Sequence, residues 1–320
     1  MEEITLLKSR IYETDEYYYS NYKDNWYIDC QVLKDGGSLN LREYYAKEYH
    51  APNMGTTNPK GQIAISRDSV LCLNDSGKTT QLIEKQNNCF SSVQRKIIAL
   101  ASTGEDYIGL TEDGELVIEN PTRFHGISCS SDYGRRIIDV VACEGHLALL
   151  QIDGDVKCYD LAGWLSSPDH KTIVNSWHNI KQVAIGYYNA MGVKSDGTVL
   201  YHSELETTDR HFYNHCRGVV QVDCTSVYYG VDYSAVLHAD GTVTSDSFEG
   251  TKEWHEIIQI AVNERCIVGL KRNGTIVAIK NGKDVSDQID WTDIVNIECK
   301  FFLLVGITKD GYVKTMMLSI

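Results

Sequence analysis

The chain has 320 residues, a formal net charge of −14 and a hydrophobic content of 42%. Because nucleic-acid affinity comes mainly from Lys and Arg displacing counterions, this charge argues against nucleic acid or an anionic membrane as the partner. No run approaches the roughly 18 apolar residues of a membrane span, and residues 1–8 lack the apolar core of a secretory signal. The ten cysteines include no Cys-x-x-Cys pair. We expect them to be buried thiols in a reducing compartment, and therefore a cytoplasmic protein.

The N-terminal segment, residues 1–56, lacks a clear repeat and holds nine of the 20 tyrosines. Exposed tyrosine is favoured at protein interfaces because it offers a large contact area at low entropic cost. An edge strand rich in β-forming residues explains the same composition equally well. We expect a divergent N-terminal blade or a closure segment that completes another blade. The candidate partner-binding residues in it are Tyr17, Tyr18, Tyr19 and Tyr22.

Residues 57–320 repeat one pattern about every 40 residues: an apolar couplet, about ten mixed residues, a pair centred on Asp-Gly, then strand-forming residues. The couplets begin at Ile97, Ile137, Ile180, Val219, Ile257 and Ile294. The turns follow at Asp113, Asp153, Asp196, Asp240, Asn273 and Asp310. A weaker turn at Ser76-Gly77 marks a seventh unit. A period of this length indicates a repeat architecture in which neighbouring units cover each other's apolar faces.

Each unit predicts three short strands, with the Asp-Gly pair turning the chain between the second and the third. We expect a tight primed turn in which both residues take a positive φ. The spacing fits neither an EF-hand nor a nonapeptide calcium repeat, so turn chemistry is the favoured interpretation.

A bulky residue precedes several couplets by three positions. It is Trp177, Trp254 or Trp291, with Cys216 in the equivalent place. Recurring residues of this kind are typical of packing wedges between adjacent sheets, and we expect these to be buried.

The stretch from Ile279 to Ser286, closing on Trp291-Thr292-Asp293-Ile294-Val295, resembles the short bacterial form of the regulator of chromosome condensation repeat. The resemblance implies an all-β fold, a β-propeller of seven blades, with eight or six as alternatives, in one domain over residues 1–320. The longer Gly-Gln-Leu-Gly linker of the eukaryotic family is missing, as are a recognisable GTPase-binding loop and a basic chromatin-binding tail. Nucleotide exchange is therefore not carried over. His146 matches the family's recurrent histidine after glycine, which is a structural position.

Few residues suggest a metal-binding or catalytic role. His211, His215 and Cys216 could hold zinc, but the pattern lacks the glutamate of His-Glu-x-x-His, and a polar loop is the favoured interpretation. Carboxylates are scattered, and there is no phosphate-binding glycine loop and no nucleophile elbow. We expect no enzyme activity, no cofactor and no metal.

The unit that begins at Val219 is enlarged by five residues, around 225–233. Insertions into repeats map to loops on one face, which is often the binding face. We therefore expect a non-enzymatic protein-interaction scaffold that contacts a basic or neutral protein surface, as a monomer or as a subunit of a hetero-complex. The candidate contacts here are Tyr228, Tyr229, Asp232 and Tyr233. The alternatives are a lectin-like glycan-binding propeller and a propeller lyase or hydrolase acting at the channel mouth.

Overall fold

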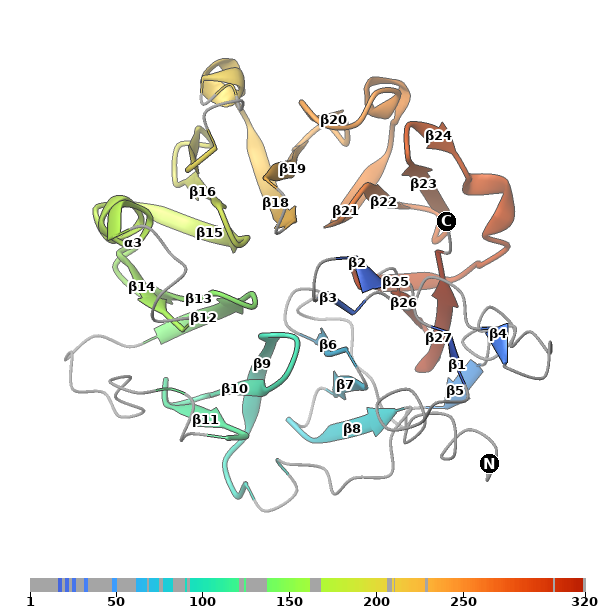
Figure 1. The fold of residues 1–320 in the computed structure, drawn as a ribbon, viewed down its shortest axis with the longest axis horizontal. Coiled ribbons are helices and arrows are strands. Elements are labelled where there is room, and N and C mark those ends of the chain that lie inside the picture. The colour runs from blue at the N-terminus through green and yellow to red at the C-terminus, as the bar shows by residue number, and fades with distance from the viewer. Residues whose placement is uncertain are drawn as a thin grey trace.

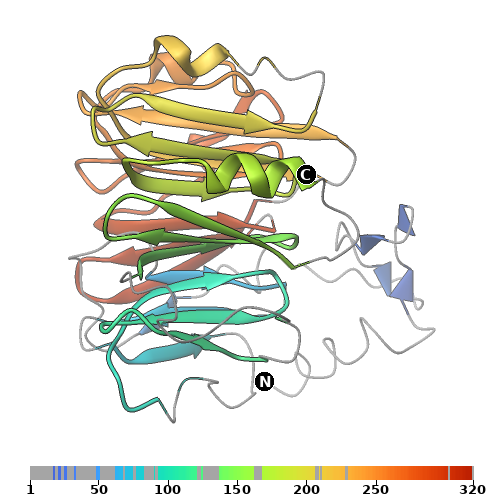
Figure 2. The same ribbon diagram turned by 90° about the vertical axis from the view of Figure 1, so that its left-hand side faces the viewer.

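The computed structural model describes residues 62–67, 69–74, 77–82, 90, 93–120, 124, 137–161, 168–205, 209, 211–227, 230–301 and 303–318, and five short strands before residue 51. In this part of the chain, seven antiparallel sheets of three or four strands surround a central axis (Figure 1). Seen from the side, they form a disk whose strands run across its thickness (Figure 2). The fold is an all-β propeller, as expected. No helix in the described residues is long and apolar enough to cross a membrane.

The sheets follow one another in chain order. The first contains β6 (Ile63–Ile65), β7 (Val70–Leu73) and β8 (Thr79–Leu82), and the second contains β9 (Ile97–Ser102), β10 (Tyr107–Thr111) and β11 (Leu116–Ile118). The third contains β12 (Ile137–Ala142), β13 (His146–Gln151) and β14 (Val156–Asp160), and the fourth contains β15 (Ile180–Ile185), β16 (Asn189–Lys194) and β17 (Val199–Ser203). The fifth contains β18 (Val219–Val227), β19 (Val231–His238) and β20 (Val243–Thr244). The sixth contains β21 (Ile257–Asn263), β22 (Cys266–Lys271), β23 (Ile276–Lys280) and β24 (Lys283–Asp284). The seventh contains β25 (Ile294–Lys300), β26 (Leu303–Thr308), β27 (Tyr312–Met317) and β5 (Glu48–His50).

The connections between sheets carry short helices. They are α3 (Pro168–Asn175), η2 (Phe212–His215), η3 (Thr251–Glu253) and η4 (Ser286–Gln288). Before the disk, β1 (Tyr17–Tyr18) pairs with β4 (Val32–Leu33), and β2 (Asn21–Tyr22) pairs with β3 (Asn25–Trp26). Strand β5 pairs antiparallel with β27, so the seventh sheet combines residues from both ends of the chain.

Each apolar couplet starts the first strand of its sheet. The first couplet residue is buried in five of the six units, as at Ile180, Val219 and Ile257, and half-buried at Ile137. The second residue sits at a register shift, for example between Ile257 and Gln259, and Ile258 there is 43% exposed. A β-bulge adds one unpaired residue and bends the strand. The couplet is therefore one buried anchor followed by one bulge residue, rather than two buried positions.

The Asp-Gly turns differ from the expected primed turn. The glycines have positive φ, as at Gly197 (79°) and Gly274 (81°), but the residues before them do not. Gly197 N–H donates to Lys194 O at 2.9 Å, and Asp196 Oδ1 accepts from the Thr198 backbone N–H at 2.9 Å. This is a turn closed by a left-handed glycine, as in hairpins with a G1 bulge. The aspartate accepts hydrogen bonds that fix the turn, and so it has no need of a positive φ.

These turns also join neighbouring sheets. The carbonyl of the turn glycine accepts a hydrogen bond from the first couplet residue of the next unit, as in Ile294 N–H to Gly274 O at 3.0 Å. A Cβ at Gly274 would lie 3.0 Å from the Asp293 backbone, so the close approach excludes a side chain there. The same contact recurs at Gly154, Gly197 and Gly241. We call this backbone contact the inter-sheet clasp.

The tryptophans are packing wedges, which confirms the prediction. Trp177, Trp254 and Trp291 are each 6% exposed. Each packs onto a glycine of its own sheet: a Cβ on Gly269 would lie 2.9 Å from Trp254 Cζ3. Each tryptophan ring also packs in a hydrophobic cluster with residues of the preceding sheet, as Trp254 does with Leu237 of the fifth sheet. The described cysteines are free thiols, and all but the half-buried Cys143 are buried.

Candidate functional site

The turns that follow the first strand of each sheet meet at one end of the disk. The first strands β15, β18, β21 and β25 each begin at an inter-sheet clasp, so these strands run the same way and end on the opposite face. We call that face the mouth face and define it by Arg67, Gly104, Glu144, Tyr187, Arg265 and Phe301. It surrounds one end of the central channel.

A lysine crosses the channel beneath this face. Lys300, the last residue of β25, donates from Nζ to Ser102 O at 2.6 Å and to Ala142 O at 3.3 Å. Those carbonyls belong to the second and third sheets, so the side chain spans the axis. Burial lowers the pKa of Lys300, while Cys143 and the carboxylates Glu298, Glu144 and Asp223 oppose that shift.

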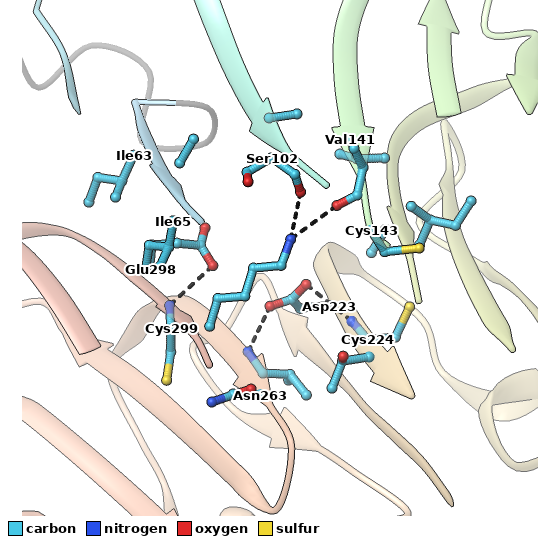
Figure 3. Close-up of a pocket in the computed structure, with 18 of the residues that line it drawn as sticks. Ile63, Ile65, Ser102, Val141, Cys143, Asp223, Cys224, Asn263, Glu298 and Cys299 are labelled. Carbon is cyan, nitrogen blue, oxygen red and sulfur yellow. Dashed lines mark hydrogen bonds between the residues drawn. The ribbon is translucent and has the colours of Figure 1, made fainter. Parts of the chain in front are cut away.

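Two of those carboxylates, Asp223 and Glu298, face the same space (Figure 3). Asp223 accepts from Val262 N–H at 2.7 Å, and Glu298 accepts from Cys299 N–H at 3.1 Å. The cavity that they line has a volume of about 140 Å³. Ligand pockets are usually about 300–1,000 Å³. The channel is therefore too small for a typical substrate, and its polar groups tie strands together.

Above the lysine, side chains from distant sheets close the mouth. Arg67 Nη2 lies 2.7 Å from Glu144 Oε1, and Arg67 Nη1 lies 3.6 Å from Glu105. The Phe301 ring reaches across to Gly104, where a Cβ would lie 2.8 Å from Cζ. These contacts join the first, second, third and seventh sheets, so the mouth face is a fixed surface.

Glu264 is the perturbed acid of this face. Burial, with Glu144 nearby, raises its pKa to about 7, and Arg265 and Arg67 oppose the shift. A raised carboxyl pKa is found at many functional sites, but structural charge networks produce it too.

The enlarged unit extends two strands instead of adding a loop. β18 and β19 have nine and eight residues, and their register continues to the pair Val227 and Val231. The extension rests on the fourth sheet: Ser226 Oγ accepts from Tyr188 N–H at 2.7 Å, and Asn189 Nδ2 donates to Thr225 O at 3.1 Å. Asn189 Nδ2 and Ser203 Oγ of the same sheet also donate to Tyr233 O and to the Asp232 carboxylate on β19. The expected loop over 225–233 is therefore a β-hairpin whose two strands are both hydrogen-bonded to the fourth sheet.

The residues that the sequence predicted to contact a partner differ in burial and in contacts. Asp232 is 9% exposed, and its carboxylate accepts a hydrogen bond from Ser203 of the fourth sheet, so it anchors the hairpin. Tyr233 is half-buried near the Phe248 ring at 5.6 Å, and it bonds Arg265. Tyr17, Tyr18 and Tyr22 belong to short strands whose side chains lie outside the described residues. Tyr19, Tyr228 and Tyr229 also lie outside the described part.

The segment with His211, His215 and Cys216 contains the 3-10 helix η2. The two histidines are exposed and Cys216 is 3% exposed. His211 Nδ1 pairs with Asn214 Nδ2 at 3.1 Å. The cysteine packs between sheets in the wedge position, as expected, and among the described residues these three side chains form no metal-binding group.

The sequence analysis did not identify the charged residues of the mouth face. Several residues of this face share a sequence position, because Glu144, Glu264 and Phe301 each lie seven residues after the start of a couplet. Aligning the repeat units would have placed them on one face with Tyr187. The contacts between non-neighbouring sheets carry no such signal, since they depend on the closed ring.

No protein-family model and no curated protein sequence matches the chain. Solved structures do match. The CRINKLY WD40 ectodomain of the Arabidopsis thaliana receptor kinase ACR4 is 10% identical, with a TM-score of 0.54, and the match covers 81% of this chain and 94% of that one. Prp20p from Saccharomyces cerevisiae is 13% identical, with a TM-score of 0.51, over 87% of this chain and 84% of that one; its title describes binding to Gsp1p and histones. BBS1N in complex with ARL6DN is 14% identical, with a TM-score of 0.52, over 84% of this chain and 95% of that one. The fold is thus similar to that of regulator of chromosome condensation propellers.

Proposed function

We propose that this protein is a non-enzymatic interaction scaffold that binds a protein partner on the mouth face and the β18–β19 hairpin. The observation that carries the proposal is a rigid, mixed surface: exposed arginines and acids surround a closed channel, with Tyr188 beside the hairpin. Aromatic residues and arginine are enriched at protein interfaces. Similar propellers bind proteins, among them Prp20p and BBS1N.

Two alternatives are less well supported. A lectin-like site needs exposed aromatic platforms, whereas Trp177, Trp254 and Trp291 are buried wedges. An enzyme at the channel mouth needs room for a substrate, and the cavity of about 140 Å³ provides little. We further propose membership of the short regulator of chromosome condensation repeat family and a reducing, cytoplasmic setting, which the free buried cysteines support.

Affinity capture of the full chain from its native cells, followed by reconstitution with the purified partner, tests the proposal. Arg265→Glu and Tyr188→Ala should each weaken partner binding by about 10-fold or more, as central interface truncations do. Arg272→Glu, at the exposed turn before Asn273-Gly274 on the opposite face, is the matched control and should bind as the wild type. Tyr228→Ala and Tyr229→Ala, between β18 and β19 in the chain, extend the test to the enlarged unit. Loss of binding on Arg272→Glu, with Arg265→Glu unaffected, would assign the interface to the opposite face.

A further inference from the structure

Three histidine rings stack in the interior between the third and fourth sheets. His146 begins β13, His170 lies in α3 and His202 lies in β17. The His146 and His170 ring centroids are 4.5 Å apart, and those of His170 and His202 are 5.2 Å apart. His146 and His170 are 0% exposed and His202 is 7% exposed. Sequence neighbours do not predict this cluster, because its members are 24 and 32 residues apart.

Other ligand-type side chains accompany the rings. Cys158 Sγ lies within 4.8 Å of ligand nitrogens of His146 and His170. His170 also belongs to a second group, in which ligand atoms of His170, His202 and Glu204 lie within 4.8 Å of one another. Nitrogen and thiolate sulfur are the ligands that Zn²⁺ prefers in structural sites.

The buried nitrogens lack the partners that a purely structural histidine would have. Among the described residues, no hydrogen bond reaches His146 Nδ1 or either nitrogen of His170. Buried polar groups in native proteins are nearly always hydrogen-bonded, so three such atoms in one cluster call for a ligand. The backbone carbonyl of Tyr187 lies 3.2 Å from His146 Nε2. That contact fixes the proton on Nε2 and leaves the Nδ1 lone pair directed at the cluster, which is the usual support for a metal-bound histidine.

Zinc binds neutral imidazole and thiolate sulfur, so coordination removes the proton of the Cys158 thiol.

We propose that His146, Cys158 and His170 bind one Zn²⁺ ion, with a water molecule as its fourth ligand. The ion joins β13 and β14 of the third sheet to α3, in the connector that leads to the fourth sheet. The connector 161–176 interrupts the repeat at this point, and α3 brings His170 to the cluster. Binding releases the Cys158 proton to solvent as the zinc–sulfur bond forms.

The test uses the untagged full chain, stripped with a chelator and titrated with Zn²⁺ and Co²⁺. We expect one equivalent of metal, a thiolate-to-cobalt charge-transfer band, and proton release measured by calorimetry in buffers of different ionisation enthalpy. His170→Leu should weaken zinc binding by more than about 100-fold, beyond the loss typical of supporting residues. Cys158→Ser should abolish the charge-transfer band while keeping the ligand-field bands.

His178→Leu is the matched control, because this exposed histidine near α3 pairs with Asp155 and contacts none of the cluster. It should bind zinc as the wild type does. If His170→Leu does not fold, the cobalt spectrum of Cys158→Ser decides. Wild-type chain that takes up no stoichiometric zinc, or a cobalt spectrum unchanged by Cys158→Ser, overturns the proposal. Either result leaves the partner-binding proposal untouched, since the mouth face is tested separately.

Discussion

On the mouth face, the closed ring of sheets brings charged side chains from different repeat units close together. Glu264 is held near Glu144 by turns that belong to the sixth and third sheets. Burial is the main cause of the raised pKa of this acid, and Glu144 of the third sheet adds to it. Part of the shift therefore depends on the closed ring.

Replacing Glu264 should show how much its ionised carboxylate destabilises the folded chain. The pKa of Glu264 is about 7 in the folded chain and 4.5 in the unfolded one, so the folded state retains the proton longer. Below pH 4.5 both states are protonated and Glu264→Gln should leave the free energy of unfolding unchanged. As the pH rises through 7 the wild type loses this contribution, and the variant should be more stable by about 1–3 kcal/mol at pH 8. Urea denaturation at pH 4 and pH 8 measures the difference.

The control is Glu253→Gln, at an exposed acid of η3. Its stability relative to the wild type should change little between the two pH values. A Glu264→Gln variant with no pH-dependent gain would show that the carboxyl group ionises normally.

At the scale of the element, two glycines differ in what they require: one needs only a positive φ, and the other also lies against backbone at the inter-sheet clasp. Gly274 and Gly282 both have positive φ, at 81° and 73°. A Cβ on Gly274 would lie 3.0 Å from the Asp293 backbone, whereas a Cβ on Gly282 would meet nothing within 4 Å.

Alanine substitution should therefore have unequal costs. Gly282→Ala carries only the left-handed backbone penalty, about 1 kcal/mol. Gly274→Ala adds a clash with backbone that cannot move without opening the clasp, and should cost at least about 2 kcal/mol more. Thermal unfolding of both variants checks this. Equal losses of stability in the two variants would mean that the backbone at the inter-sheet clasp can move apart at little cost.

The elements were largely predictable because each unit repeats its own local signal. Couplets, turns and wedges gave the strand starts, the turn positions and the buried tryptophans. The primed turn was wrong because an aspartate side chain can fix a turn by accepting hydrogen bonds. The loop over 225–233 was wrong because added residues prolonged a strand ladder. The contacts across the mouth face and the histidine cluster could not be found from local pattern, since both join residues that only ring closure or a connector helix brings together.

For the whole molecule, the decisive feature is a belt of amide side chains. Gln182 donates to Val222 O at 3.1 Å, Gln221 donates to Ile260 O at 2.7 Å, and Gln259 donates to Ile297 O at 2.9 Å. Each amide oxygen accepts from the facing backbone, as in Ile260 N–H to Gln221 Oε1 at 3.0 Å. Asn296 then donates to Gln62 Oε1 at 2.9 Å, so the belt passes from the seventh sheet to the first.

Breaking the last link should destabilise the disk as a whole. Asn296→Leu removes two buried side-chain hydrogen bonds, the one that Asn296 Oδ1 accepts from Gln259 and the one that Asn296 Nδ2 donates to Gln62, at about 1–3 kcal/mol each. We expect a lower urea midpoint, with tryptophan fluorescence and far-ultraviolet circular dichroism still changing together. Asn214→Ala, on exposed η2, is the control and should shift the midpoint little. Separate transitions in the wild type would show that the sheets unfold independently.

The hydrogen bond between Gln62 and Asn296 also distinguishes this closed ring of repeats from an open stack. An open stack of repeats has two end units, each with a single neighbour, and can unravel from either one. Here the unit that the chain makes first and the unit that it makes last hold each other, so no sheet is terminal in space. The protein is therefore a closed ring whose stability depends on the contact between its first and seventh sheets, which can form only after both have been synthesised.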